Sequence, residues 1–376
     1  MTRNEVRYGR TYTGRIGAVV VAFIVATYPI PAQTLTWLGA GSYAYGVSRD
    51  GSVVAGWYRS ADNRARAFRW ERSVGMQDLG TLGGDTSAAY ALSRDGSVLV
   101  GSSRTARGTA EAFRWTAADG VQSIGALPGD STSVAYGVSA DGAVVVGTSG
   151  WMGSERAFRW TENEGIRELS GLERRRSQAR DVSADGSVVV GWLYNDAGDY
   201  RAFRWVNGVV EELGTLGGQR SLARAVSANG RFVVGAASDS AERLQAFLWT
   251  PDRGMIPLGV LGNSWSDAAA VSADGSVVVG WSPNAYGWVR AFRWTPQRGM
   301  EDLNRVYARL LSEGSYLEVA YGISPDGRYI VGHGYDAATG RGGAYLLDTV
   351  PEPASFMALG LGLAGLVLRR RRSEGK

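Results

Sequence analysis

The sequence contains no cysteine and a single histidine among its 376 residues. Without cysteine the chain forms neither disulfides nor thiolate metal sites, and His333 alone gives no zinc site. No Asp-x-Asp-x-Asp loop suggests bound calcium. These absences predict a protein with no metal ion and no cofactor. They also leave nucleophilic catalysis without a set of histidine bases.

A strong charge of one sign is also missing once the two ends of the chain are set aside. The whole chain has a formal charge of +4 and an isoelectric point near 9.3. Residues 1–32 hold four basic residues and one acidic residue, and residues 351–376 hold five basic and two acidic residues. The remaining 31 basic and 33 acidic residues give a charge of −2. We therefore expect no nucleic-acid partner.

The N-terminus lacks an apolar run long enough to span a membrane comfortably. Four arginines precede a short apolar run from Ile16 to Ala26, and Ala32 follows two prolines. This order is typical of a signal peptide. We predict that residues 1–32 are exported by Sec-type machinery and removed by signal peptidase near Ala32. A retained membrane anchor is the alternative.

What the chain does have is a pattern that recurs seven times. Its first half reads V-S-x-D-G-S-V-V-V-G, and its second half reads R-A-F-R-W. The serines are spaced by 45, 46, 44, 44, 45 and 52 residues, so only the last interval is stretched. They are Ser48, Ser93, Ser139, Ser183, Ser227, Ser272 and Ser324. A fixed period of this size indicates one supersecondary unit copied side by side.

Each unit contains the signals of four short strands. In the third unit, Asp141-Gly142 separates two apolar runs, which is a strong hairpin signal. The R-A-F-R-W segment lies in a third strand, 156–161, whose alternation places Phe158 and Trp160 on one face and Ala157 and Arg159 on the other. A glycine turn at Gly165 then leads into a fourth strand, 166–169. Four strands in about 45 residues predict the blade of a β-propeller.

The two ends of the repeat array predict how the ring closes. Residues 35–39 resemble the fourth strand of a unit that has no preceding three, and 344–347 form a third strand with no fourth. We therefore predict an all-β, seven-bladed β-propeller over 33–348, in which an N-terminal strand completes the last blade. The apolar stripe in the stretched interval, between Leu303 and Leu311, predicts a short helix packed over one end of the ring.

The repeated polar residues are interpreted as scaffold. The aspartates of the S-x-D-G turns lie one to a blade, so no two of them can converge as a general acid and base. Gly-Val-Ser-x-Asp at 46–50 lacks the second glycine of a nucleophile elbow. His333 occupies a position where other units carry tryptophan, and we interpret it as a substituted strand-end residue. We predict no catalytic residue.

The loops between the second and third strands of each unit are not repeated. We expect them to gather on one rim of the propeller, and several carry aromatic residues that can stack on sugar rings or on a protein partner. The alternative is that these rings cover the blade edges. The candidates are Trp151, Tyr194, Tyr200, Tyr286, Trp288 and Tyr335.

The C-terminal segment, 349–376, combines three features in a fixed order. Val350-Pro351-Glu352-Pro353-Ala354 is followed by an apolar stretch to Leu368 and by the basic cluster Arg369, Arg370, Arg371 and Arg372. This resembles the PEP-CTERM sorting signal of Gram-negative bacteria. The resemblance implies an exosortase as partner, transient membrane insertion through the apolar transmembrane helix, and delivery to the cell surface or extracellular matrix. An ordinary C-terminal anchor is the alternative.

The repeat units also resemble a known family. Residues 78–84 read D-L-G-T-L-G-G, and 212–218 nearly repeat this signature. Both are similar to the HAF repeats of bacterial extracellular proteins, although the histidine of that name is replaced here in every unit. The resemblance implies an extracellular repeat protein and assigns no activity.

Together these features predict an exported, non-catalytic repeat protein. The context of PEP-CTERM signals is exopolysaccharide and the biofilm matrix, so the resemblance implies an exopolysaccharide or matrix protein as ligand. Two alternatives stay open, a polysaccharide-active propeller enzyme and a purely structural matrix component.

Overall fold

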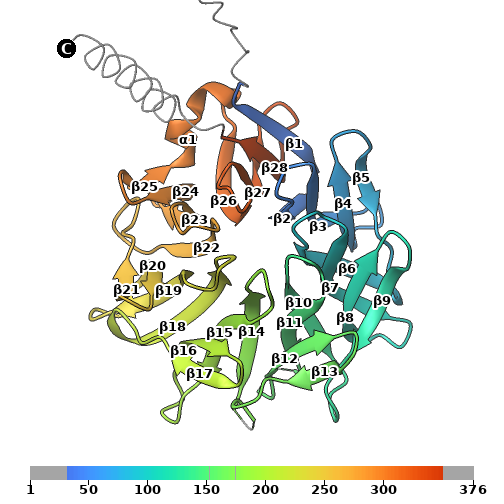
Figure 1. The fold of residues 1–376 in the computed structure, drawn as a ribbon. Helices are drawn as coiled ribbons and strands as arrows, with labels where there is room; N and C mark the ends of the chain where they lie inside the picture. The colour runs from blue at the N-terminus through green and yellow to red at the C-terminus, as the bar shows by residue number, and fades with distance from the viewer. Residues whose placement is uncertain (1–31, 152, 174, 350–376) are drawn as a thin grey trace, which may run out of the picture. The chain divides into compact units, whose positions relative to one another are not determined.

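The computed structural model describes residues 32–151, 153–173 and 175–349. These residues form seven four-stranded antiparallel sheets arranged in a ring, with the first strand of each repeat innermost (Figure 1). No helix in these three ranges is long and apolar enough to cross a membrane. Residues 1–31 of the predicted signal peptide and the sorting signal from Val350 onward lie outside the described residues.

The blades follow the repeat units in chain order. Blades one to three are β2 (Ser42–Val47), β3 (Val53–Arg59), β4 (Ala65–Glu71), β5 (Gly75–Asp78); β6 (Gly83–Leu92), β7 (Val98–Thr105), β8 (Ala110–Thr116), β9 (Gly120–Gly125); and β10 (Ser133–Val138), β11 (Val144–Ser149), β12 (Arg156–Thr161), β13 (Gly165–Glu168). Blades four and five are β14 (Ser177–Val182), β15 (Val188–Tyr194), β16 (Tyr200–Val206), β17 (Val209–Glu212); and β18 (Gly217–Val226), β19 (Val233–Asp239), β20 (Leu244–Thr250), β21 (Gly254–Pro257). Blade six is β22 (Asp267–Val271), β23 (Val278–Pro283), β24 (Val289–Thr295) and β25 (Gly299–Asp302).

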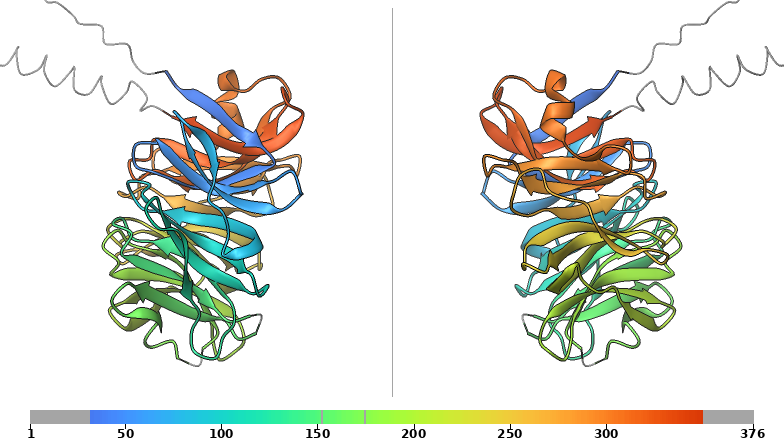
Figure 2. Two further views of the ribbon diagram at one scale, coloured as in Figure 1. Left: turned by 90° about the vertical axis from the view of Figure 1, so that its right-hand side faces the viewer. Right: turned by 90° about the vertical axis from the view of Figure 1, so that its left-hand side faces the viewer.

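Blade seven closes the ring. It consists of β26 (Tyr316–Ile323), β27 (Tyr329–Asp336), β28 (Arg341–Asp348) and, as its outer strand, β1 (Thr34–Ala40). β1 pairs antiparallel with β28 from Thr34 opposite Asp348 to Ala40 opposite Gly343. The two ends of the array therefore lie in one sheet (Figure 2). The seven-bladed all-β fold closed by an N-terminal strand is confirmed.

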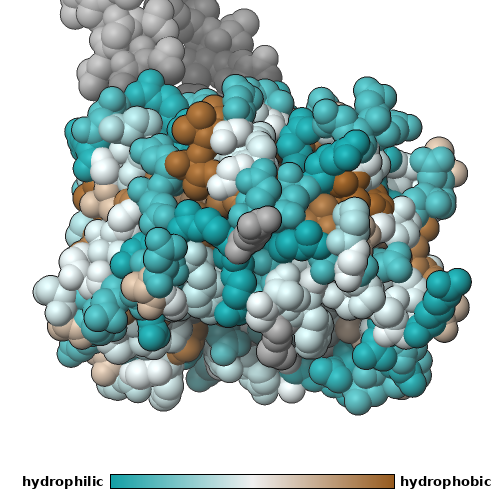
Figure 3. Space-filling view, turned by 90° about the horizontal axis from the view of Figure 1, so that it is seen from below, coloured by the Kyte–Doolittle hydropathy of each residue, from teal (hydrophilic) through white to brown (hydrophobic). Residues whose placement is uncertain are grey.

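The core lies between neighbouring blades. The phenylalanine of R-A-F-R-W is fully buried in all six complete units, and Tyr345 takes its place in the seventh. The glycine of each second strand lies beside that ring, because a Cβ at Gly147 would stand 2.0 Å from the Val134 carbonyl oxygen and 2.9 Å from Phe158. The side of the ring seen in Figure 3 is a mixture of hydrophilic and intermediate residues with small separate apolar patches. Burial between blades therefore supplies most of the hydrophobic stabilisation.

The S-x-D-G segments form the predicted turns. In blade three the Ser139 hydroxyl donates to Asp141 Oδ1 at 2.6 Å and accepts from the Val144 N–H at 2.9 Å. Asp141 Oδ1 also accepts the Ala143 N–H at 3.0 Å, and Gly142 has φ +74°. These bonds engage both the repeated serine and the repeated aspartate. The recurrence of these two residues from unit to unit therefore has a structural reason.

A second serine, at the start of most inner strands, joins adjacent blades. Its hydroxyl accepts the N–H of the alanine in the preceding blade's R-A-F-R-W segment, as Ser177 does from Ala157 at 3.1 Å. Six of the seven junctions have this bond. At the junction of blades six and seven the corresponding residue is Glu318, and Asn304 instead bonds the backbone N–H and carbonyl of Leu317.

Asn304 belongs to the insertion that stretches the last interval. The predicted helix is present as two short segments, α1 (Leu303–Val306) and the 3₁₀ turn η1 (Ala308–Leu310). Leu303 and Tyr307 are buried with core residues of blades six and seven. The insertion therefore packs into the outer part of one blade junction, and the expectation that it lies over one end of the ring is wrong. The apolar stripe does pack against a core, as predicted.

Candidate binding sites on the rim and in the central channel

The predicted rim aromatics differ in exposure and in whether they contact another ring. Trp151, Tyr286 and Trp288 are the most exposed, at 65%, 77% and 60%. Tyr194, Tyr200 and Tyr335 are half-buried. Within the described ranges no ring contact joins Trp151 to another aromatic, whereas the other five candidates each contact at least one ring.

The largest group crosses from blade six to blade seven. Tyr286 and Trp288 lie 5.6 Å apart, and the Arg290 guanidinium lies 5.3 Å from the Trp288 ring and 4.5 Å from Tyr316. Tyr316 in turn stacks on Tyr335 at 5.5 Å. We call these five residues the aromatic strip. The guanidinium links two aromatic pairs through cation–π contacts, so the strip is continuous.

The turn between β23 and β24 presents the exposed end of this strip. The Asn284 side-chain oxygen accepts the backbone N–H groups of Tyr286 and Trp288 at 2.9 and 3.2 Å. Gly287 between them has φ +81°, a conformation that glycine adopts at little cost. The local sequence therefore holds both rings outward in one backbone geometry.

A smaller group lies on blade four. Tyr194 and Tyr200 contact each other and Trp192, with centroid distances between 5.5 and 6.5 Å. Arg176 lies over Tyr194 at 4.2 Å, and Arg220 of blade five lies over Tyr200 at 5.6 Å. Beside Tyr200 is a cavity of about 240 Å³. These rings pack against arginines at the blade edge.

The central channel holds a second candidate site, which the sequence analysis missed. Every inner strand has a register shift that leaves one residue, three positions before the repeat serine, outside the ladder. A bulged residue is directed away from the regular alternation of the strand. The seven bulged residues are Tyr45, Tyr90, Tyr136, Arg180, Arg224, Ala269 and Tyr321.

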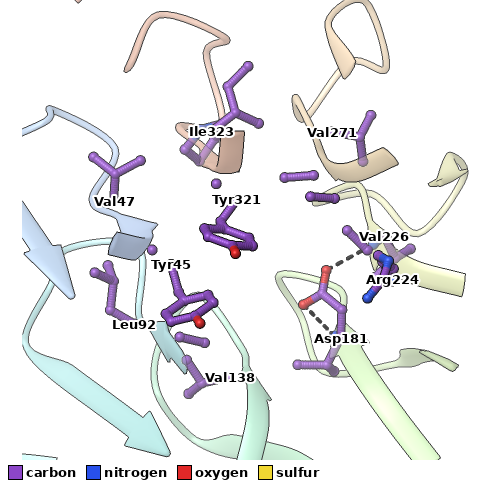
Figure 4. Close-up of a pocket in the computed structure, with 18 of the residues that line it drawn as sticks. Tyr45, Val47, Leu92, Val138, Asp181, Arg224, Val226, Val271, Tyr321 and Ile323 are labelled. Carbon is purple, nitrogen blue, oxygen red and sulfur yellow. Dashed lines mark hydrogen bonds between the residues drawn. The ribbon is translucent and has the colours of Figure 1, made fainter. Parts of the chain in front are cut away.

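All seven bulged residues line a cavity of about 550 Å³ in the channel. Figure 4 shows Tyr45, Arg224 and Tyr321 around it. At the channel end where the first and second strands of each blade are joined by their turn, backbone hydrogen bonds run from blade to blade. One example is the bond from the Ala140 N–H to the Ala184 carbonyl at 3.0 Å. Arg94 belongs to this chain of bonds and also lines the cavity. The cavity has the size of an ordinary small-molecule site.

Two carboxylates in this region are engaged by the protein itself. Asp267 receives two hydrogen bonds from Arg224, at 2.7 and 2.6 Å. Asp181 accepts the backbone N–H groups of Val182 and Val226, both at 2.8 Å (Figure 4). Burial raises the pKa of Asp181 to about 7, and the two N–H groups act against that rise.

Arg180 differs from these groups. Its guanidinium stacks on the Tyr136 ring at 4.0 Å, and burial lowers its pKa below the usual value. Among the described residues no carboxylate forms an ion pair with it, whereas Arg224 has Asp267. Arg180 is therefore a half-buried positive charge on the cavity wall that forms no ion pair with a carboxylate of the described residues.

These channel residues were not among the candidate site residues predicted from the sequence. Arg180, Asp181 and Arg224 all replace the tyrosine, glycine or alanine of other units, and all line one cavity. The signal was available as variation at two positions of the inner strand. It was not recognised because a bulge depends on the pairing with the next strand, which the sequence of one strand does not display.

His333 has a packing role. Its ring stacks on Tyr43 at 3.9 Å, and Tyr43 stacks on Trp57 at 4.5 Å. His333 Nδ1 lies 3.0 Å from the Ser42 carbonyl oxygen. The side chain thus joins blade seven to blade one. In the three described ranges no group of three His, Cys, Asp or Glu side chains is placed to hold a metal ion.

Comparisons with known proteins define the class. Residues 349–372 match the model of the PEP-CTERM protein-sorting motif. No curated protein matches the chain. Among solved structures, an oligogalacturonate lyase from Vibrio parahaemolyticus is similar in fold, with a TM-score of 0.56, 10% identity, and coverage of 85% of this chain and 94% of the lyase.

Two further structures are proteases or parts of them. The β-propeller domain of the trilobed protease from Pyrococcus furiosus, described as having an open velcro topology, gives a TM-score of 0.53 at 11% identity over 85% of this chain and 98% of that domain. One of two prolyl endopeptidases gives 0.54 at 11% identity over 85% of this chain and 51% of the enzyme. At these identities the likeness concerns the fold alone. The chain is a seven-bladed β-propeller with a C-terminal exosortase sorting motif.

Proposed function

We propose that this chain is an exported, non-catalytic propeller that an exosortase sorts to the cell envelope or extracellular matrix, where it binds a glycan. In this proposal residues 1–32 are the signal peptide, 33–348 are the HAF-type propeller, and 349–376 are the sorting signal. The match to the sorting motif supports export and processing at a membrane. Pro351, Glu352 and Pro353 then serve processing and take no part in binding.

The aromatic strip carries the glycan assignment. Tyr286 and Trp288 expose most of their rings although neither fills a blade core. Exposed neighbouring rings offer flat apolar faces to the C–H groups of a sugar, and a guanidinium beside them offers donors to its hydroxyl or carboxylate oxygens. Because the strip continues through Arg290 to Tyr316 and Tyr335, it can accommodate several consecutive residues of an extended polysaccharide.

Binding to immobilised polysaccharide from the bacterial matrix tests this assignment. We expect retention of the full chain, and loss of retention in the double variant Tyr286→Ala/Trp288→Ala. Trp151→Ala is the matched control, because Trp151 is equally exposed but lies outside the strip. Absence of retention by the wild type, or equal retention by the double variant, would contradict the proposal. A purely structural matrix component would show no saturable binding.

A polysaccharide-active enzyme is the second candidate, and the channel residues favour it. Asp181, with its pKa near neutrality, lies beside Arg180 and several tyrosines in one cavity. Perturbed carboxyl groups of this kind occur at catalytic sites and also in structural networks. Incubating the purified chain with the same polysaccharide and measuring new reducing ends or unsaturated products decides between the two functions. Turnover that Asp181→Asn abolishes would establish the enzyme.

A further inference from the structure

In the channel cavity more positively charged than negatively charged side chains are available to bind a ligand. Its lining includes three arginines, Arg94, Arg180 and Arg224, and one acidic residue, Asp181. Arg224 is neutralised by Asp267, and both oxygens of Asp181 accept backbone N–H groups from the wall. The turn aspartates do not line the cavity, and those of the first four blades and of the sixth bond the serine and backbone of their own turn.

Arg180 is the donor best placed for an external anion. Stacking on Tyr136 holds the flat guanidinium in one plane and leaves its edge for hydrogen bonding. A guanidinium edge matches a carboxylate with two parallel hydrogen bonds, as Arg224 and Asp267 show at the next blade. A bound acid would supply Arg180 with the same pair of hydrogen bonds. Burying a charge without a partner is unfavourable, so a bound anion would relieve that cost.

The rest of the cavity suits the body of a small polar molecule. Tyr45, Tyr90 and Tyr321 surround it with ring faces and hydroxyl groups, and Tyr45 and Tyr321 lie side by side at 4.7 Å. Ala269 is the one small member among the seven bulged residues, so the ring of large side chains is open next to Arg224. The space is therefore asymmetric, with arginines on blades four and five, Ala269 on blade six and tyrosines on the other four blades.

We propose that the channel binds a small organic acid of about the size of a sugar acid, with its carboxylate on the edge of Arg180 and its body against the tyrosines. A cationic ligand would meet Arg94 and Arg180, and a neutral ligand would leave Arg180 without a counter-ion. This site is separate from the aromatic strip, so the inference stands or fails independently of glycan binding there.

Isothermal titration of the full chain with D-glucuronate, succinate and D-glucose tests the proposal. D-Glucose is the matched neutral control, since it differs from D-glucuronate only in having a hydroxymethyl group in place of the carboxylate. We expect saturable binding of at least one acid and affinity for D-glucose at least about tenfold weaker, the value expected for loss of a charge-assisted pair. Absence of saturable binding by both acids, or equal binding of D-glucose and D-glucuronate, overturns the assignment.

Variants then place the acid. Arg180→Met should weaken acid binding by roughly tenfold or more, and Arg180→Lys should retain part of it because the charge remains. Arg72→Met, at an exposed arginine on the turn between β4 and β5, is the control and should bind as the wild type does. Because a misfolded Arg180→Met would mimic lost binding, its melting temperature is measured without ligand and compared with the wild type. A folded Arg180→Met that binds the acid normally overturns the proposal.

Discussion

Arg224 of blade five holds Asp267 of blade six through two parallel hydrogen bonds, from Nε to Oδ1 at 2.7 Å and from Nη2 to Oδ2 at 2.6 Å. The guanidinium also lies 5.3 Å from the Trp281 ring. Asp267 has no acidic counterpart at the equivalent position of the other units, and only blade four, with Arg180, also has an arginine where Arg224 lies. The pair therefore fixes one blade junction by contacts that the repeated sequence does not provide.

Breaking this pair should destabilise the fold. Removing the Asp267 carboxylate leaves the Arg224 charge in a largely buried site, so we expect Asp267→Asn to lower the free energy of unfolding by about 2–4 kcal/mol. The double variant Arg224→Met/Asp267→Leu should recover most of that loss, because both charges are gone. Urea denaturation of the single and double variants measures the coupling. Additive losses in the double variant would contradict this account.

Asp181 should make stability depend on pH in the opposite sense to an ordinary ion-paired carboxylate. Its pKa of about 7 in the folded chain exceeds the usual 3.8, so the native state binds a proton that the unfolded state releases. Stability then falls by roughly 2–4 kcal/mol as the pH rises from about 4 to about 7. Asp181→Asn should remove that slope and be more stable than the wild type at pH 8, measured by urea denaturation across pH.

Asp185, in the adjacent turn, is the matched control. Hydrogen bonds from Ser183 and Ser187 lower its pKa to about 2. Its contribution is therefore present above the unfolded pKa and is lost as the pH falls through the folded value. Asp185→Asn should weaken the fold at pH 7 and have a smaller effect near pH 2. Identical pH slopes for the two variants would show that burial does not distinguish the two carboxyl groups.

The second-strand glycines should tolerate no side chain. A Cβ at Gly147 would overlap the Val134 carbonyl oxygen at 2.0 Å, and that backbone cannot move without breaking the inner strand. We expect Gly147→Ala to cost about 3 kcal/mol or more. At Gly165 the turn has φ +66° but open space, so Gly165→Ala should cost about 1 kcal/mol, from the backbone conformation alone. Thermal melting of both variants compares the two costs.

The blades could be predicted from the sequence because each strand signal recurs in seven units. A weak signal in one unit is therefore supported by the same signal in the others. The alternation in 156–161 and the Asp-Gly turn at 141–142 are local features, and the structure contains both. The strip was only partly predictable. Tyr286 and Trp288 lie in an unrepeated loop, and Tyr335 lies near the end of β27, in a segment predicted as such a loop. Tyr316 opens an inner strand and joins them only because blades six and seven are adjacent.

The channel residues could not be derived from alternation. In 179–181 the regular pattern would place Arg180 and its two neighbours on alternate faces, but the bulge brings both Arg180 and Asp181 to the cavity. One extra residue in a strand is defined by its partner strand and leaves no mark in its own sequence. The helix at 303–311 was predicted as an element, but its location depended on the missing serine at the last junction.

The closing strand should carry a measurable share of the stability. Leu38 of β1 is 7% exposed and packs with Phe68 of blade one and Leu346 of blade seven, so it joins the first and last blades in one core. Leu38→Ala leaves a cavity there and should lower the free energy of unfolding by about 2–4 kcal/mol. Thr34→Ala, at an exposed position of the same strand, should change it little. If β1 merely lay along the last blade, the two variants would unfold at the same urea concentration. A lower midpoint for Leu38→Ala alone therefore identifies the N-terminal strand as the element that holds the ring closed.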